Sequence, residues 1–438
     1  MSFPAYPAYQ DSVVEWLGEV PAHWILRRLG YYLAERREKV SDRDFPALSV
    51  TKSGIVPQLE TAAKTDDGDN RKRVCAKDFV INGRSDRKGS SGLSTLDGSV
   101  SLINIVLYPH QPIEMEFVGH LLKSPPFQEE FYRYGKGIVA DLWSTNFSEM
   151  RNILLAVPPP TEQSAIAAFL DRETGKIDAL VAEQERLIAL LKEKRQAVIS
   201  HAVTKGLDPS VPMKDSGIEW LGQVPEHWNV RALSSMVRRG TTITYGIVQA
   251  GPDQLDGIPY IRTSDMSGSE FPEQGYLKTT PEIDRAYSRS KVEAGDLVVA
   301  IRATVGKTLK VPAHLHGANL TQGTARVSPG PLVDVEYLFL FLNSHSANQG
   351  FDAQSKGATF KEITLEMLRK FRVPLPPMSE QRSIVMGLGA KAASFDVLGA
   401  EATRAIALLR ERRAALISAA VTGKIDVRGL VPETEVAA

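Results

Sequence analysis

The segment at residues 188–204 reads IALLKEKRQAVISHAVT, and the segment at residues 406–422 reads IALLRERRAALISAAVT. The two agree at 12 of 17 positions and lie 218 residues apart. A second pair lies upstream, where residues 15–24 read EWLGEVPAHW and residues 219–228 read EWLGQVPEHW, with 8 of 10 positions identical and a separation of 204. An ordered set of matches like this is typical of an internal duplication. The 438-residue chain therefore carries two copies of one plan.

The two copies differ in length and in their middle parts. A short match between DFVI at 78–81 and DLVV at 296–299 already has the separation of 218, so the 14 additional residues of the second copy must lie upstream of it. Between the tryptophan motif and the long repeated segment, the copies match only in scattered pieces. A duplicated frame with unlike middles indicates two different binding surfaces.

Both long segments carry an apolar seam with alternating four- and three-residue steps, which predicts a coiled coil. Gln184 and Arg195 interrupt the seam of the first helix. Because both helices have the seam, we expect them to pack against each other as an antiparallel pair within the chain. About 43 residues at 1.5 Å each would give a rod of roughly 65 Å. The seam residues are Ile177, Val181, Ile188, Leu191, Val198 and Ala202 in the first helix and Phe395, Ala402, Ile406, Leu409, Leu416 and Ala420 in the second.

A proline stretch precedes each long helix, PPP at 158–160 and PLPP at 374–377. We expect Thr161 and Ser379 at the N-cap positions, where a hydroxyl can accept from a free backbone N–H. Glu162 and Glu380 then fall in the first turn, where the helix dipole favours a negative charge.

The segments before the prolines mix short β-type runs with turn residues, which predicts compact α/β domains of about 130–150 residues each. The runs are DFVING at 78–83, SLINIVLY at 101–108, IPYIRT at 258–263 and DLVVAIRA at 296–303. Short helices are expected at 116–124 and 335–344. The four tryptophans of the repeated motif are expected to anchor the start of each domain by packing in its core: Trp16, Trp24, Trp220 and Trp228.

The composition is that of a globular protein, with 43% apolar and 24% charged residues. No run of about 18 uninterrupted apolar residues occurs, so we expect no membrane span, and the first residues resemble no secretory signal. Cys75 is the only cysteine, which excludes an intrachain disulfide and a cysteine-rich zinc site. These features are compatible with a reducing cytoplasm.

Motifs for bond chemistry are missing from the sequence. The VGKT at 305–308 resembles the end of a phosphate-binding loop, but Ile301 stands where the first glycine is needed. There is no glycine-rich nucleotide fingerprint after a strand and no Asn-Pro-Pro-aromatic methyltransferase loop. His314 and His316 lie one residue apart without a supporting cluster of ligands, so we expect no metal site there. The sequence therefore predicts no catalytic residue and no cofactor bound by this chain.

The 52 basic and 52 acidic residues balance, so any nucleic-acid surface has to be local. Basic residues gather at 71–88 and 285–310, which occupy matching places in the two copies. Arg and Lys can bind guanine, and Asn and Gln suit adenine, but most such contacts go to phosphate. The alternative for each single residue is a solvated charge at a strand end. The DNA-binding candidates are Arg71, Arg73, Asn82, Arg84, Arg87, Lys88, Arg302 and Lys307, with Lys52, Lys136, Asn146, Tyr245, Arg262, Thr263, Gln322 and Lys356 as weaker ones.

If two such domains sat at the ends of an antiparallel helix pair, they would meet one DNA duplex at a fixed separation. Recognition elements one or more helical turns of DNA apart read separated half-sites. This arrangement predicts a bipartite target with an unread spacer, for which the helices act as a ruler.

The sequence resembles the specificity subunits of type I restriction–modification enzymes. The resemblance rests on the EWLG-x-VP-x-HW openings, on the PP-x-x-EQ segments at 158–163 and 376–381, and on the helix ends at 199–204 and 417–422. It covers nearly the whole chain. It implies target recognition domains at 1–158 and 207–377, helical spacers at 159–206 and 378–425, a tail at 426–438, and a pseudo-twofold arrangement.

The resemblance also implies the partners. These are double-stranded DNA, two modification subunits and two motor–nuclease restriction subunits, with S-adenosylmethionine, ATP and Mg²⁺ bound by the partner subunits and not by this chain. Two other readings remain open, a coiled-coil adaptor with two protein-binding domains and an autonomous methyltransferase or nuclease. The adaptor would show no sequence-selective DNA binding, and the enzyme would be active as a purified chain.

Overall fold

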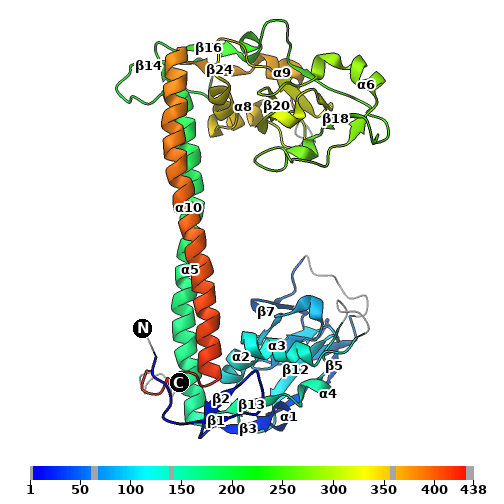
Figure 1. Ribbon diagram of the computed structural model, residues 1–438, viewed down its shortest axis with the longest axis vertical. Helices are drawn as coiled ribbons and strands as arrows, with labels where there is room; N and C mark the ends of the chain where they lie inside the picture. Colours follow the sequence, from blue (N-terminus) through cyan, green and yellow to red (C-terminus); the bar gives the residue numbers. More distant parts are fainter. Residues whose placement is uncertain (1–2, 61–67, 138–142, 356–361, 431–438) are drawn as a thin grey trace. The chain divides into compact units, whose positions relative to one another are not determined.

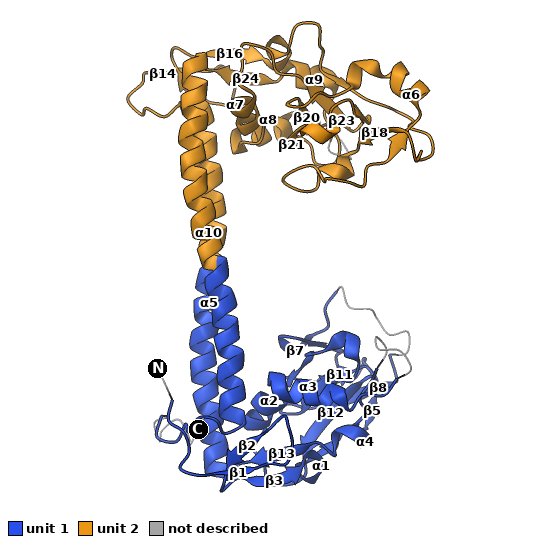
Figure 2. Ribbon diagram, viewed as in Figure 1, with its two compact units in different colours: residues 1–185, 403–438 blue, residues 186–402 orange. Residues whose placement is uncertain are grey.

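A computed structural model describes residues 3–60, 68–137, 143–355 and 362–430. The chain forms two compact units, one made of residues 1–185 and 403–438 and the other of residues 186–402 (Figure 2). The helices α5 (Pro160–Lys205) and α10 (Met378–Val421), labelled in Figure 1, each contribute one part to either unit, as the two colours of Figure 2 show. The boundaries between the two compact units therefore fall within the two long helices. The domain boundaries expected from the sequence instead treat each helix as a separate spacer.

Unit 1 is built on small antiparallel sheets. A four-stranded sheet has the order β10–β9–β12–β4, and a three-stranded sheet the order β11–β8–β5, with three two-stranded ribbons beside them. The strands are β1 (Tyr9–Asp11), β2 (Glu19–Pro21), β3 (Ile25–Arg28), β4 (Leu33–Glu35), β5 (Lys39–Val40), β6 (Leu48–Thr51), β7 (Gly54–Pro57), β8 (Arg71–Val74), β9 (Phe79–Asn82), β10 (Ser91–Leu93), β11 (Gly98–Val100), β12 (Asn104–Pro109) and β13 (Leu154–Val157). The short helices are α1 (Leu29–Tyr32), α2 (Met115–Lys123), α3 (Pro125–Arg133) and α4 (Phe147–Met150).

Unit 2 repeats this plan around the four-stranded sheet β17–β23–β20–β21. Its three-stranded sheet β19–β18–β22 contains one parallel pair, β18 with β22. The strands are β14 (Met213–Asp215), β15 (Gln223–Pro225), β16 (Asn229–Ala232), β17 (Thr244–Tyr245), β18 (Ile258–Ile261), β19 (Lys278–Thr279), β20 (Leu297–Ala300), β21 (Thr308–Lys310), β22 (Asn319–Leu320), β23 (Thr324–Val327) and β24 (Arg372–Leu375). The helices are α6 (Pro281–Ala286), α7 (Val335–Leu342), α8 (His345–Gln354) and α9 (Leu365–Lys370).

The central strand of each unit is buried on both faces. In β9, Phe79 and Ile81 belong to the main core, while Val80 between them belongs to a smaller core on the opposite side. In β20, Leu297 and Val299 point into the main core, and Val298 points into the smaller one. Alternate residues of a strand face opposite sides, so a continuous apolar run is what a strand between two cores requires. The DFVI and DLVV runs thus form equivalent central strands in the two units, which confirms the expected α/β repeat.

The long helices pair in antiparallel orientation, as the apolar seam predicts. In unit 1, Arg413 of α10 contacts Asp178 of α5 at 2.9 Å, and Arg410 contacts Glu185 at 3.0 Å, so rising numbers on one helix meet falling numbers on the other. The seam positions are buried or half-buried, whereas the positions between them are largely exposed. In unit 2, Arg195 fills one of the two gaps in the seam and bonds Asp396 at 2.5 Å.

By length and composition alone, α10 contains one window apolar enough to cross a membrane, with a mean hydropathy of 1.2. Only 11% of that window is buried within the structure. The seam accounts for part of the apolar character of α10, since it packs along α5.

The start of α5 differs from the expectation at the N-cap. The helix begins at Pro160, and the N–H groups of Glu162 and Gln163 both donate to the carbonyl of Pro159, at 2.9 and 3.0 Å. Thr161 is therefore inside the first turn, and the N-cap prediction is wrong. Proline suits the first helical position because it has no N–H to satisfy and its φ is already helical.

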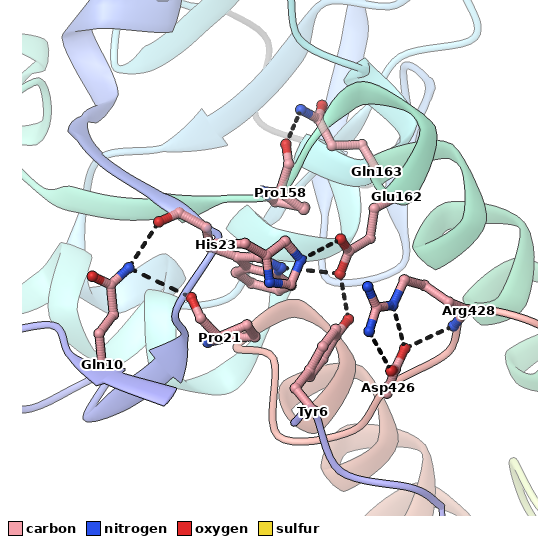
Figure 3. A network of polar contacts seen from close by, with 10 residues as sticks. Tyr6, Gln10, Pro21, His23, Pro158, Glu162, Gln163, Asp426 and Arg428 are labelled. Carbon is pink, nitrogen blue, oxygen red and sulfur yellow. Dashed lines mark hydrogen bonds and ion pairs between the residues drawn. The ribbon is translucent and has the colours of Figure 1, made fainter. Parts of the chain in front are cut away.

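The start of each long helix forms hydrogen bonds with the tryptophan motif of the same unit, which explains why the two motifs are repeated together. Glu162 lies within the domain and accepts from the indole N–H of Trp24 at 3.0 Å, and its second oxygen lies 2.8 Å from Nε2 of His23 (Figure 3). Glu380 makes the same contacts with Trp228, at 3.1 Å, and His227, at 2.8 Å. The acid of the PP-x-x-EQ segment thus fixes the HW end of the tryptophan motif in both units. The expected anchoring role is confirmed for Trp24 and Trp228, which are buried.

Candidate nucleic-acid interface

Two adjoining hollows of about 690 and 680 Å³ lie in unit 1. Arg84, which follows the buried strand β9, lines both of them, and so does Ile103. Of the residues expected from the sequence, the structure brings six to these hollows: Arg71, Asn82, Arg84 and Arg87, with the weaker candidates Lys52 and Asn146. Their gathering in one place makes this surface the candidate interface of unit 1.

Arg84 and Arg87 present their guanidinium groups to solvent. The side chain of Arg84 is 42% exposed, and its Nε donates to Asp86 at 3.0 Å. Arg87 is 68% exposed and lies 3.7 Å from the same carboxylate. Exposed ion pairs of this kind contribute about 0–1 kcal/mol, so a phosphate or a base edge can replace Asp86 at little cost.

Arg71 and Asn82 line the second hollow but are buried, so they support this surface and expose little of their side chains. Arg71 donates from Nε to the hydroxyl of Ser99 at 2.9 Å and from Nη2 to its carbonyl at 3.1 Å. Burial lowers the pKa of the Arg71 guanidinium. The side-chain oxygen of Asn82 accepts from the backbone N–H of Arg84 at 3.0 Å. These residues hold the strand ends in place, and Asn82 fixes where Arg84 leaves the sheet.

Three candidates of the first half lie outside both hollows. Arg73 bonds Glu38 at 2.9 Å and lies over the ring of Phe45, Lys88 bonds Glu129 at 2.6 Å, and Lys136 bonds Glu149 at 3.0 Å. Their DNA-binding role stays a prediction.

Two basic residues of the first hollow, Arg37 and Lys39, lie outside both basic stretches of the sequence and were not among the candidates. Both belong to the segment AERREKV at 34–40, whose dense charge is the signal that could have found them. Glu35 lies between Arg37 and Lys72, at 2.7 and 2.8 Å. Burial opposes ionisation of this carboxyl, but the two cationic hydrogen-bond partners outweigh burial and lower its pKa. Glu35 thereby holds two positive side chains at the rim.

In unit 2 the candidates collect around the strand end that carries Arg302. Its Nε donates to Glu362 at 2.9 Å, and its side chain is 43% exposed. A Cβ placed on Gly323 would lie 2.5 Å from Oγ1 of Thr263 and 3.9 Å from Cβ of Arg302, so the turn that contains Gln322 adjoins both residues. Arg262, next along the chain, is held by Asp265 at 2.7 Å. The corresponding surface of unit 2 thus assembles Arg262, Thr263, Arg302 and Gln322.

The remaining candidates of unit 2 have varied places. Tyr245 is 41% exposed and pairs in register with Ala325 of β23. Lys307 donates from Nζ to the carbonyl of Ser267 at 2.8 Å, which ties the VGKT segment to a neighbouring loop. Lys356 lies outside the described residues. Among the residues that the structure describes, no group of three or more His, Cys, Asp or Glu could hold a metal ion.

Comparison with known proteins agrees with this fold. Residues 225–393 match the family model described as the type I restriction modification DNA specificity domain. The EcoBI specificity subunit of Escherichia coli is 30% identical over 284 residues, which are 64% of this chain and 60% of the relative. The putative MjaX specificity subunit of Methanocaldococcus jannaschii is 22% identical over 94% of this chain and 96% of its own length.

The chain is therefore similar to the type I specificity subunits.

Solved structures support the same fold across both units. A chain from a study of complex assembly and conformational transition of the type I restriction–modification system has a TM-score of 0.66 at 18% identity, covering 92% of this chain and 98% of that one. The HsdS subunit of Thermoanaerobacter tengcongensis has a TM-score of 0.51 at 19% identity over the same shares. Two tandem α/β domains and a pair of long helices are therefore shared by this chain and its structural relatives.

Proposed function

We propose that this chain is a specificity subunit that binds a bipartite, asymmetric DNA site, with unit 1 reading one half and unit 2 the other. The observation that carries the proposal is the repetition of one frame with different exposed side chains. An arginine leaves the buried central strand at the same place in both units, but the neighbouring turn carries Leu102 and Ile103 in unit 1 and Gln322 and Gly323 in unit 2. If both units approach DNA in the same way but present different side chains, each unit reads a different half-site.

The experiment is adenine methylation mapping across a genome, in cells that carry the matching modification subunit with and without this gene. A split motif with an unread gap that appears only with the gene supports the proposal. Absence of a new motif, although the modification subunit is active with another specificity partner, would favour an adaptor with two protein-binding domains.

We propose that the chain performs no bond chemistry itself. The sequence offers no nucleotide or cofactor loop, and Lys307 of the VGKT segment is bonded to a carbonyl oxygen. S-adenosylmethionine, ATP and Mg²⁺ would then belong to the partner subunits. Purified chain that methylated or cleaved DNA without partners would contradict this.

The proposed partners are two modification subunits and, in the full enzyme, two restriction subunits, in the cytoplasm. Large apolar side chains are exposed on the long helices in both units, which favours a protein that covers them. They are Leu180 and Leu408 in unit 1 and Leu187, Leu190, Met386, Val397 and Leu398 in unit 2. The masses of the reconstituted complexes would give the stoichiometry.

A further inference from the structure

A tight turn with two exposed apolar residues stands at the candidate interface of unit 1. Ser101–Asn104 closes when the backbone N–H of Asn104 donates to the carbonyl of Ser101 at 3.1 Å. The side-chain amide of Asn104 also donates to that carbonyl, at 3.1 Å, and to the Ser101 hydroxyl, at 3.0 Å. Leu102 and Ile103 occupy the two central positions and are 41% and 49% exposed. Turn centres usually hold Gly, Pro, Asn, Asp or Ser, so this pair is unusual there.

The turn is held from both sides. Lys72 donates from Nζ to the carbonyl of Asn104 at 2.8 Å, and the N–H of Gly83 donates to the carbonyl of Ile103 at 3.3 Å. The apolar tip therefore has a fixed backbone before any ligand binds. A fixed tip loses little conformational entropy on binding, which suits a residue that discriminates between ligands.

Ile103 lies between the two hollows together with Arg84, since both residues line both hollows. Leu102 lines the first hollow, next to Arg37, Lys39 and Lys72. The charged residues around this turn are mostly cationic, with Glu35 and Asp86 as the acidic members of the two linings. Such a surface suits a ligand that carries negative charge along its edges and an apolar group between them. A DNA groove fits this description, with phosphates along both rims and a methyl group on each thymine.

Unit 2 has the same turn with different chemistry. The N–H of Thr324 donates to the carbonyl of Thr321 at 3.2 Å, as Asn104 does to Ser101. The ladders place the two turns in the same register, because Asn104 opposes Asn82 in β9 and Thr324 opposes Ala300 in β20. Gln322 and Gly323 thus stand where unit 1 has Leu102 and Ile103. Both units therefore have the same turn, which carries two apolar side chains in unit 1 and an amide side chain in unit 2.

We propose that Ile103, supported by Leu102, contacts the 5-methyl group of a thymine in the major groove of the half-site that unit 1 reads. Thymine is the base that presents a methyl group there, and contact with it is the way an apolar side chain distinguishes a base pair. The inference rests on the proposed DNA function and names a residue that selects the base. In unit 2, Gln322 takes the place of Leu102 and Gly323 that of Ile103, so the amide of Gln322 offers a donor and an acceptor, which suit an adenine edge.

The test uses the complex of this chain with its modification subunits and a duplex carrying the split motif. Each thymine of the motif is replaced in turn by uracil, which removes only the methyl group. We expect one such replacement to weaken binding by about three- to fivefold, which is what burial of one methyl group is worth. In Ile103→Ala the same replacement should make no difference. Ile25→Ala is the control, because Ile25 lies in β3 and is similarly exposed, at 53%; it should keep the full sensitivity to uracil.

Three results would overturn the inference while leaving the DNA function intact. The motif could hold only G·C pairs in the half-site of unit 1, no uracil replacement could change the affinity, or Ile103→Ala could keep the sensitivity to uracil. Leu102→Ala gives a second variant, expected to reduce the sensitivity without abolishing it. If no split motif depends on the gene, the proposed function itself fails, and this result is distinguishable from the other three.

Discussion

Arg84 and Arg302 form the same backbone bridge in the two units, Arg84 with Ser144 and Arg302 with Glu362. Both members of the pair are shifted by 218 residues, the separation of the repeated long helices. The two arginines are also equally exposed, at 42% and 43% of the side chain. They differ in their carboxylate partners, Asp86 for Arg84 and Glu362 for Arg302. One position of the fold thus presents a guanidinium group in two different settings.

Replacing these arginines should separate the half-sites. Arg84→Ala should weaken binding to duplexes with a correct first half-site by about tenfold and leave discrimination in the other half unchanged, and Arg302→Ala should do the reverse. Affinities for duplexes with single base changes are the measurement. Arg27→Ala and Arg231→Ala, at equivalent exposed positions of β3 and β16, are the controls. Equal weakening on every sequence would mean that the arginines bind phosphate and read no base.

Glu162→Gln should destabilise unit 1 more than Glu380→Gln destabilises unit 2. Glu162 accepts a third hydrogen bond, from the Tyr6 hydroxyl at 2.5 Å, and burial together with this bond raises the pKa of Tyr6 well above its usual range. Loss of charge-assisted bonds at a buried acid costs about 1–3 kcal/mol. Thermal unfolding of each variant gives the ranking, with Glu183→Gln on the exposed face of α5 as the control. A larger effect at Glu380 would contradict the role assigned to Tyr6.

Acidification should remove the contribution of Glu35. The pKa of this carboxyl is lowered in the folded state, so its stabilisation is complete above the unfolded pKa and is lost as the pH falls through the folded value. Glu35→Gln should therefore lower the melting temperature at pH 7, with a cost of about 1 kcal/mol, and the difference should shrink toward pH 3. Glu60→Gln, at an exposed position, should show no such trend. A difference that grew on acidification would show that the ion pairs are not the cause.

Gly389→Ala should stabilise unit 2. Gly389 lies within α10, and an added Cβ would meet nothing within 4 Å, so the gain is the helix propensity of alanine, about 1 kcal/mol. At Gly387 the new Cβ would lie 3.3 Å from Cδ1 of Leu207, so Gly387→Ala should gain less. Melting curves of both variants test the pair. Loss of stability in Gly389→Ala would indicate that α10 needs flexibility there.

The sequence predicted the frame of the fold because its signals are local or repeated. The seam of α5 and α10 needs only the periodicity of each helix, and the run at 79–81 only the period of a strand. Glu162 lies in the first turn as predicted, but its hydrogen bonds to the domain were not predicted, since the first turn of a helix favours an acid for its own reasons. The bonds to Trp24 and Tyr6 join residues 138 and 156 positions away, and no local pattern indicates them.

The candidate site was predicted only where charge marked it. Arg84 stands out because basic residues cluster around it and because Arg302 repeats it. Ile103 carries no such mark, since an apolar residue beside a strand predicts core packing. Its exposure depends on the turn that Asn104 closes and on the hollows at either side. Such a residue is recognised only once the neighbouring strands have been paired.

The division of the chain into units sets the order in which they can fold during translation. Unit 2 consists of one uninterrupted stretch, so all its residues are present before Thr403 is added. Unit 1 needs the last part of α10, and its N-terminal segment is held to the residues after that helix, where the N–H of Asp426 donates to the carbonyl of Pro4 at 2.7 Å. The half that is synthesised first is thus completed last. A nascent chain released early within α10 would carry a finished second domain beside an open first one.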